Sequence, residues 1–402
     1  SAQLPPQHAA AIARRMKEID LFGGIRRMEY GAAIEKGMIS LLGAETDAAF
    51  LKNVMEQAIN RDAVAQAAKR FTVVYTPFHG TGYQLIPEAL SRLGIRNLLC
   101  VKQQMVIDGN FPTVNSPNPE EPKSFAMSVR LAEQHHADLI IGSDPDADRV
   151  GIMARNAQGE YESFSGNQTG VLLLNYFIGA RKKAGTLPQN AAVLKSVVTT
   201  KMARAVSESY GVPCIDTFTG FKFMAEKKGQ LEEDGAKKVI FSYEESYGYM
   251  VGDYVRDKDA VTASMLLAEM AAWYDTQNKT LFDALEELYE RLGYYGERTM
   301  NLLMPGLDGI CKMKSLMRDL RKNPLSHIEG VPVLSVNDYE SGLSVNLRTG
   351  KEQKLELCGG NLLSFELEDG TSFMVRPSGT EPKIKVYILA KETSRQAIGE
   401  KV

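Results

Sequence analysis

The sequence has few of the features that mark secreted, membrane-spanning or cysteine-dependent proteins. Its four cysteines (Cys100, Cys214, Cys311 and Cys358) stand far apart and form no C-x-x-C pair, which excludes a cysteine zinc site and suits a reducing compartment. No uninterrupted apolar run approaches the length of a membrane span, and the N-terminus lacks the basic-then-apolar order of a secretory signal. The sequence therefore predicts a cytoplasmic protein without a membrane partner.

An excess of charge of one sign is also missing. Lys and Arg number 47 and Asp and Glu number 50, so the formal net charge is -3 and the pI is near 6.1. This balance disfavours nucleic acid as a partner. Hydrophobic residues at 44% and charged residues at 24% are ordinary values for a folded soluble protein. The 402 residues are enough for about two to four domains.

Strand and helix patterns alternate through most of the chain, which is typical of the α/β class. Apolar runs predict buried strands at 71–75, 97–101 and 137–141, with helical patterns at 83–93 and 124–135 between them. The alternation restarts after Ser165, with strands predicted at 192–198, 213–216 and 238–243 and helices at 166–178, 201–210 and 259–274. Two further helical patterns precede the first strand, at 7–20 and 47–69. The order strand, turn, helix, strand predicts parallel sheets.

The last hundred residues differ. Turn dipeptides at Asn337-Asp338, Thr349-Gly350 and Asp369-Gly370 separate short β-rich segments, which predicts a smaller α+β domain with an antiparallel sheet. The predicted fold class is therefore α/β, with two consecutive α/β domains followed by this C-terminal domain. The predicted boundaries are 1–45, 46–164, 165–293 and 294–402.

The sharpest chemical feature is the motif GSDPDADR at 142–149. Asp144, Asp146 and Asp148 alternate directly after a predicted strand, and an extended backbone would place all three on one side. Crowded carboxylates repel one another unless a cation neutralises them, and hard oxygen ligands favour Mg²⁺, Mn²⁺ or Ca²⁺. The alternative is an acidic loop that caps a helix. Arg149 could hold a phosphate group or simply pair with one of the aspartates.

Three other loops carry polar groups. The turn RPSGTEP at 376–382 combines an arginine, a glycine and two hydroxyls, which suits a phosphate group but also an ordinary Pro-Gly turn. YEESYG at 243–248 could contact sugar hydroxyls or be a solvated acidic turn. TFTGFK at 217–222 follows a predicted strand, where ligands of parallel α/β folds bind. No P-loop, dinucleotide fingerprint or Ser-His-Asp set occurs.

Taken together, eight ordered motifs resemble the α-D-phosphohexomutase family, which contains phosphoglucomutase and phosphomannomutase. The matching segments are TPFHGTG (76–82), PNPEE (117–121), GSDPDADR (142–149), FSGNQTG (164–170), TFTGFK (217–222), YEESYG (243–248), RDKDA (256–260) and RPSGTEPK (376–383). Their variants are most similar to the bacterial phosphoglucomutase branch. The resemblance implies a four-domain protein with one cleft, which would act as an isomerase.

The resemblance also implies roles for individual residues. Asp144, Asp146 and Asp148 would bind Mg²⁺, and Arg149 and Lys258 would lie near the reacting groups as catalytic residues. The sugar would be held by Thr219, Gly220, Glu244 and Ser246, and the phosphate that is not being transferred by Arg376, Ser378, Gly379 and Thr380. Either Lys383 or Lys385 could join the phosphate site.

One departure from the family is decisive for the predicted activity. The family's nucleophile is a phosphorylated serine in a Thr-Ala-Ser-His-Asn-Pro loop, and no such loop occurs in the sequence. Ala2–Pro6 resembles the family segment that follows this loop. We therefore expect residues 1–45 to be the remnant of a first, phosphoserine-bearing domain and the chain alone to be inactive. That missing N-terminal domain is an expected partner.

For the intact protein the resemblance implies interconversion of hexose 1-phosphate and hexose 6-phosphate. The reaction would pass through a hexose 1,6-bisphosphate, which would also act as activator. The alternatives are a non-catalytic sugar-phosphate-binding protein and a phosphopentomutase. A phosphatase of the haloacid dehalogenase type fits less well, because Asp148 stands where that family has Thr or Val. YEESYG favours glucose over mannose or a pentose.

Overall fold

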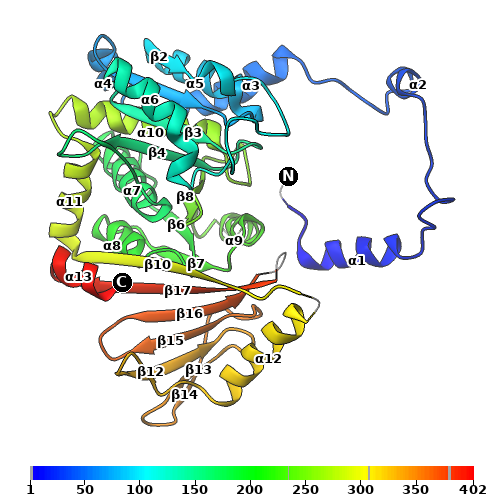
Figure 1. Ribbon diagram of the computed structural model, residues 1–402, viewed down its shortest axis with the longest axis vertical. Coiled ribbons are helices and arrows are strands. Elements are labelled where there is room, and N and C mark those ends of the chain that lie inside the picture. Colours follow the sequence, from blue (N-terminus) through cyan, green and yellow to red (C-terminus); the bar gives the residue numbers. More distant parts are fainter. Residues whose placement is uncertain (1–2, 234, 307, 379–381) are drawn as a thin grey trace. The chain divides into compact units, whose positions relative to one another are not determined.

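The computed structural model describes residues 3–233, 235–306, 308–378 and 382–402. The chain forms two compact units, each assembled from separate stretches of sequence. The first unit comprises residues 1–163, 220–242 and 247–278. The second comprises residues 164–219, 243–246 and 279–402. Figure 1 labels most of the elements of both units.

The first unit contains a five-stranded sheet in the order β2-β1-β3-β4-β5. Its strands are β1 (Thr72–Thr76), β2 (Asn97–Cys100), β3 (Leu139–Ser143), β4 (Val150–Arg155) and β5 (Tyr161–Ser163). β1 pairs in parallel with β2 and β3, whereas the pairs β3–β4 and β4–β5 are antiparallel. The parallel pairing predicted for the strands at 71–75, 97–101 and 137–141 is confirmed, whereas β4 and β5 were not predicted as strands. The residues that join β3 to β4, 144–149, are too few for the crossover that a parallel pair requires.

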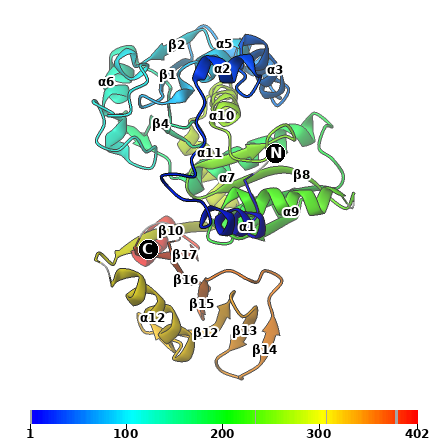
Figure 2. The ribbon, with the colours of Figure 1, turned by 90° about the vertical axis from the view of Figure 1, so that its right-hand side faces the viewer.

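The first unit also contains helices after residue 43. They are α3 (Ala44–Met55), α4 (Arg61–Ala67), α5 (Leu85–Leu93), α6 (Ala126–His135), α9 (Phe221–Glu233) and α10 (Ala260–Asp275), with 3₁₀ turns at Thr81–Tyr83, Lys102–Gln104 and Pro122–Phe125. α5 and α6 contact this sheet, and α10 contacts α3, α4, α5, β3 and β4 and lies beside α3 and α5 in Figure 2. Contacts on so many sides explain why its sequence is almost wholly apolar. Asp259 caps its first turn.

The segment before α3 has little buried surface. It contains α1 (Pro6–Met16) and α2 (Tyr30–Glu35), and most of its described side chains are exposed. α1 ends at Met16, earlier than the predicted 7–20, and the Asp20 carboxylate accepts the N–H groups of Phe22 and Gly23 in a turn that follows. Among the described residues, no helix is both long and apolar enough to cross a membrane.

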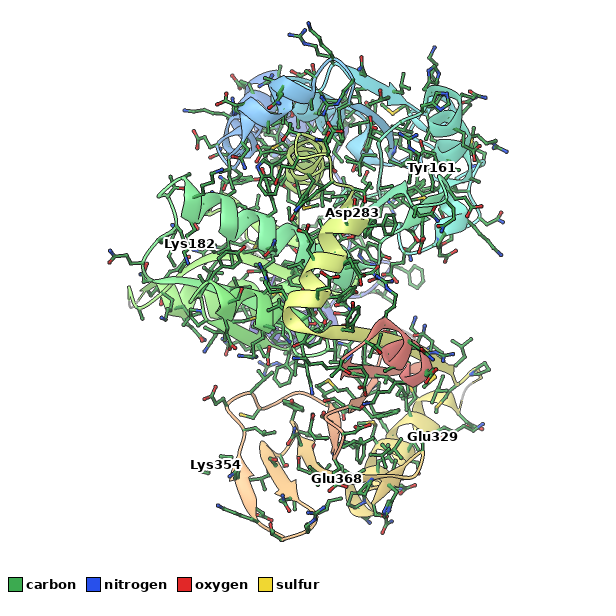
Figure 3. All side chains as sticks on the ribbon, turned by 90° about the vertical axis from the view of Figure 1, so that its left-hand side faces the viewer. Tyr161, Lys182, Asp283, Glu329, Lys354 and Glu368 are labelled. Atoms are coloured by element: carbon green, nitrogen blue, oxygen red, sulfur yellow. The ribbon has the colours of Figure 1, made fainter. Side chains whose placement is uncertain are left out.

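A second sheet has four strands. They are β6 (Ala191–Ser196), β7 (Cys214–Thr217), β8 (Lys238–Glu244) and β9 (Gly248–Val251), in the order β7-β6-β8-β9. β6 and β7 pair in parallel, as predicted. The helices α7 (Gly166–Lys183), α8 (Met202–Ser209) and α11 (Leu281–Leu292) belong to the second unit. Capping boxes start α7 at Ser165 and α11 at Thr280, whose partner Asp283 is labelled in Figure 3.

The C-terminal part of the second unit is a separate antiparallel sheet. Its elements are β10 (Tyr294–Leu303), α12 (Gly309–Lys322), β11 (His327–Ile328), β12 (Val331–Asp338), β13 (Leu343–Asn346), β14 (Glu352–Lys354), β15 (Leu363–Leu367), β16 (Ser372–Pro377), β17 (Lys383–Glu392) and α13 (Arg395–Lys401). The sheet order is β10-β17-β16-β15-β12-β13-β14, and β11 pairs with β12. Met313 and Met317 of α12 pack with Val336 and Phe365 in its core. The predicted α/β class with a smaller antiparallel α+β end is confirmed.

Two of the three predicted turns in this sheet are confirmed. Gly370 and Gly350 both have positive φ angles, of 82° and 68°, in the turns after β15 and β13. The turn predicted at Asn337-Asp338 is wrong, because both residues belong to β12. The turn begins where that strand ends, and the N–H of Gly342 donates to the Asp338 carbonyl at 2.9 Å.

We expect the stability of the fold to depend on pH through the carboxyl group of Glu297, a residue of β10. Burial raises the pKa of its carboxyl to about 7 from an ordinary 4.5, and a hydrogen bond from the Thr200 hydroxyl only partly opposes this. Since the folded-state pKa is the higher one, ionising Glu297 costs more in the folded chain. Its contribution to stability is therefore lost as pH rises from about 4.5 to about 7.

We expect Glu297→Gln to remove this loss. The free energy of unfolding of the variant, relative to the original chain, should rise by on the order of 1–3 kcal/mol between about pH 4.5 and about pH 8. Urea titrations at both pH values measure it, with the exposed Glu290→Gln as the matched control. An equal pH response of both variants would contradict the prediction.

Candidate functional site

The acidic motif forms a tight turn between β3 and β4. The N–H of Asp144 donates to the Arg149 carbonyl at 3.2 Å, and the N–H of Ala147 donates to the Asp144 carbonyl at 3.0 Å. Ala147 has a φ angle of 56°, in the left-handed region that is uncommon for alanine. The backbone is thus folded back rather than extended. The expectation of an extended segment is wrong, although the carboxylates still converge.

The ligand oxygens of Asp144, Asp146 and Asp148 all lie within 4.8 Å of one another. Asp144 is almost fully buried, Asp148 is partly buried and Asp146 is exposed. Burial raises the pKa of Asp144 to about 7, opposed by the N–H of Arg149 and reinforced by repulsion from Asp148 and Asp146. A cation between the three oxygens would remove this repulsion. The arrangement therefore fits a hard divalent ion.

The turn is supported by the segment TPFHGTG. The Thr81 N–H donates to the Pro145 carbonyl at 2.8 Å, and a Cβ on Gly80 would lie 2.4 Å from the Pro145 Cα. Only glycine permits this approach. His79 makes hydrogen bonds through both ring nitrogens, with the Val106 carbonyl at 2.9 Å and the Thr113 hydroxyl at 2.8 Å. His79 is therefore a structural residue of this support.

Two cationic side chains, Lys258 and Arg149, lie beside the carboxylates of the acidic turn. The Lys258 Nζ lies 2.5 Å from an Asp148 oxygen, and the Arg149 guanidinium lies 3.5 Å from Glu120 and 3.7 Å from Asp148. Burial lowers the pKa of Lys258, but the hydrogen bond and charge of Asp148 outweigh burial, so its pKa is raised overall. Lys258 is therefore an ammonium group at neutral pH. It contacts the Asp148 carboxylate, which is also one of the three candidate metal ligands.

Gly248 makes room for this lysine. A Cβ there would lie 2.7 Å from the Lys258 Cδ and 3.0 Å from the Phe221 ring. Gly248 also forms an isolated antiparallel β-bridge with Arg149. At the start of α10, the Ala260 N–H donates to the Ala147 carbonyl at 3.1 Å. In the first unit, then, the structure brings together the predicted metal and catalytic residues: Asp144, Asp146, Asp148, Arg149 and Lys258. Gly220, with a φ angle of 118°, precedes α9 in the same unit.

The remaining predicted residues belong to the second unit. Glu244 is buried at the end of β8, and Ser246 is partly buried in the turn after it. The Thr219 hydroxyl is buried and has no hydrogen-bond partner among the residues that the structure describes. A hydroxyl in that state can bind a ligand without first breaking a protein contact. These three side chains are suitable for sugar hydroxyls.

Arg376 lies near the end of β16, and Ser378 directly follows that strand. Arg376 lies opposite Lys385 of β17, and the Ser378 N–H donates to the Lys383 carbonyl at 2.8 Å. Gly379 and Thr380 lie outside the described residues. Tyr387 of β17 is buried. Burial raises its pKa, and the charges of Glu245 and Arg376 act on its hydroxyl in opposite directions.

Three family models match the chain. They are described as phosphoglucomutase/phosphomannomutase alpha/beta/alpha domain II at residues 48–159, alpha/beta/alpha domain III at 165–292, and C-terminal domain at 344–398. A phosphoglucomutase of Staphylococcus saprophyticus is 34% identical over 385 residues, 96% of this chain and 68% of that relative. The chain belongs to the phosphoglucomutase/phosphomannomutase family.

Other members of this family match over a smaller part of their own length. A phosphoglucomutase of Staphylococcus aureus is 35% identical over 330 residues, which are 82% of this chain and 58% of the relative. The chain thus spans 58% to 68% of the length of these two relatives. The predicted membership of the family is confirmed.

Solved structures show the same fold. A putative phosphomannomutase of Thermus thermophilus has a TM-score of 0.60 at 17% identity, and the match covers 88% of this chain and 63% of that structure. The open form of a Paramecium phosphoglucomutase, pp63/parafusin, also has a TM-score of 0.60 at 17% identity, covering 87% and 58%. At this identity the likeness concerns the fold alone. It confirms the predicted phosphohexomutase type of architecture.

The structure adds contacts that the motifs did not indicate. Glu120 of PNPEE pairs with Arg149, Asp259 of RDKDA caps α10, and Glu245 of YEESYG bonds to the turn after β6. Each of these three residues lies inside a motif. Membership of the motif marks the residue in the sequence, but it does not indicate which partner the residue contacts. Tyr387 has no comparable signal, because a tyrosine in an apolar strand is typical of any sheet core.

Proposed function

We propose that this chain supplies the metal, sugar and phosphate sites of a phosphohexomutase that interconverts hexose 1-phosphate and hexose 6-phosphate, an isomerase. The observation that carries the proposal is the acidic turn, where three carboxylates converge and Lys258 contacts one of them. The names of the relatives support the activity and favour glucose as the sugar.

Asp144, Asp146 and Asp148 would hold Mg²⁺. Their oxygens are close enough to share one ion. Burial is the main cause of the raised pKa of Asp144, and repulsion from Asp148 and Asp146 adds to it, which a bound cation would relieve. A bound Mg²⁺ would polarise the transferring phosphoryl group. Arg149 and Lys258 would add fixed positive charge beside it, which stabilises the charge that spreads over the phosphoryl oxygens during transfer.

Separate groups would hold the sugar and the second phosphate. Glu244 would accept, and Ser246 and Thr219 would donate or accept, hydrogen bonds of the sugar hydroxyls, and the positive φ of Gly220 shapes the turn beside Thr219. The phosphate not being transferred would bind Arg376, Ser378, Gly379 and Thr380. A hexose 1,6-bisphosphate would act as intermediate and activator, since either of its phosphates suits this second site.

The nucleophile would come from a phosphoserine-bearing domain, of which residues 1–45 would be the end. The absence of a Thr-Ala-Ser-His-Asn-Pro loop in the sequence and the matches to domains II, III and the C-terminal domain support this assignment. The domains 46–164, 165–293 and 294–402 would follow it. The free state of all four cysteines suits a cytoplasmic location.

The test is turnover of glucose 1-phosphate to glucose 6-phosphate with Mg²⁺ and catalytic glucose 1,6-bisphosphate. Two proteins are compared, this chain and a chain extended to the start of its gene. We expect turnover by the extended chain only. Turnover by this chain alone would disprove the assignment of the nucleophile. No turnover by a folded extended chain, with mannose and pentose phosphates also tested, would disprove the activity and leave a binding protein.

A further inference from the structure

The turn that follows β6 contains two buried hydroxyls. Ser196 is the last residue of β6, and the Thr199 N–H donates to the Ser196 carbonyl at 3.0 Å, which closes the turn. The Ser196 Oγ and the Thr199 Oγ1 lie 2.7 Å apart, and neither side chain is exposed. Buried hydroxyls need partners, and a third side chain provides them.

That side chain is Glu245, from the loop that follows β8. Its Oε2 accepts hydrogen bonds from the Ser196 Oγ at 3.0 Å and from the Thr199 Oγ1 at 3.1 Å. Its own N–H donates to the Thr199 Oγ1 at 3.2 Å. Both the side chain and the backbone of Glu245 are therefore fixed to one turn. Hydrogen bonds to a charged carboxylate are among the stronger ones in proteins.

Glu245 stands between the two residues proposed to contact the sugar. Glu244 precedes it at the buried end of β8, and Ser246 follows it. With the central residue of the three held by its side chain and its N–H, the backbone on both sides loses most of its freedom. Glu244 and Ser246 are then positioned before a ligand binds, so the ordering cost does not reduce the affinity.

The same turn also supports the loop that contains Thr219. The buried Lys195 Nζ donates to the Ser196 and Thr199 carbonyls at 3.2 and 3.1 Å. It also lies 2.9 Å from an Asp216 oxygen, and Asp216 directly precedes TFTG. One turn thus anchors both loops that would hold the sugar.

We propose that Glu245 is a positioning residue that sets affinity for the sugar hydroxyls while leaving affinity for phosphate largely unchanged. It acts through the Ser196 and Thr199 hydroxyls and need not touch the ligand. The inference rests on the proposed function, because Glu244 and Ser246 matter only if a sugar phosphate binds. Within YEESYG, Glu244 would contact the sugar, whereas Glu245 would hold the loop in position.

The test compares two ligands by titration calorimetry in the presence of Mg²⁺: glucose 6-phosphate and inorganic phosphate. The variants are Glu245→Gln, which keeps the shape and removes the charge, and Thr199→Val, which removes one hydroxyl and keeps the shape. We expect each to weaken glucose 6-phosphate binding about tenfold. Inorganic phosphate should bind within about threefold of the original affinity. The exposed Glu160→Gln is the matched control and should change neither.

The two ligands distinguish a failure of the role of Glu245 from a failure of the proposed function. Equal weakening of both ligands, or no weakening of either, would overturn the role of Glu245. If the original chain binds glucose 6-phosphate no more tightly than inorganic phosphate, the proposed function fails, and the inference fails with it. Thermal unfolding identifies a variant that has not folded, and Thr199→Val decides the question where Glu245→Gln does not fold.

Discussion

Replacing Asp146 by Asn should weaken divalent-ion binding at least about tenfold, because even changes to residues behind a metal ligand cost about 10–100-fold. Asp146 is the cleanest position for the test. It is exposed, whereas Asp144 accepts the N–H groups of Asp148 and Arg149 and so holds the turn itself. Asp148 is paired with Lys258. Binding of Mn²⁺ to the variant, followed by electron paramagnetic resonance, measures the loss.

Stability without metal should change in the opposite direction. The three carboxylates repel one another, so removing one charge should raise the melting temperature of the metal-free chain. The increase in melting temperature that Mg²⁺ produces should shrink, because stabilisation by a ligand follows its affinity. Glu160→Gln, which removes a charge outside the cluster, controls for net charge. Unchanged Mn²⁺ affinity in Asp146→Asn would show that the acidic turn is not a metal site.

The strands that lead into this site could be predicted, but the shape of the turn could not. Continuous apolar runs such as 137–141 specify buried strands within a few residues, because burial on both faces leaves a local pattern. The fold-back at Ala147 is stabilised by the N–H of Ala260, which is distant in the sequence. The antiparallel pairing of β4 likewise depends on a partner, which an apolar run does not specify.

The same limit applies to the side chains around the sugar loops. Glu244 and Ser246 were predicted from the motif that they form, and that motif is contiguous. The role of Glu245 depends on Ser196 and Thr199, which are 49 and 46 residues earlier. In the sequence alone, the hydroxyls of Ser196 and Thr199 cannot be distinguished from those of the other serines and threonines. Contacts between residues distant in sequence follow from the assembled sheet, and a single sequence contains no local pattern for them.

Replacing Lys258 by Met should reduce turnover of the extended chain by roughly 10²–10⁴-fold, the usual contribution of a positioned acid or base. The Lys258 ammonium is partly buried beside Asp148, and its aliphatic stem packs against Gly248. Methionine keeps the stem and removes the charge. Lys279→Met, which removes an ammonium paired with Glu287, is the matched control and should retain full turnover.

Two further measurements decide how Lys258 acts. Arginine keeps the positive charge but does not release a proton, so recovery of turnover in Lys258→Arg would indicate stabilisation by charge and would rule out proton transfer by this residue. Lys258→Met should also bind Mn²⁺ more tightly, because Asp148 loses its competing partner. A variant that retains turnover within about threefold of the original would remove Lys258 from the reaction. Because the ion pair keeps Lys258 protonated, it must give a proton before it can accept one.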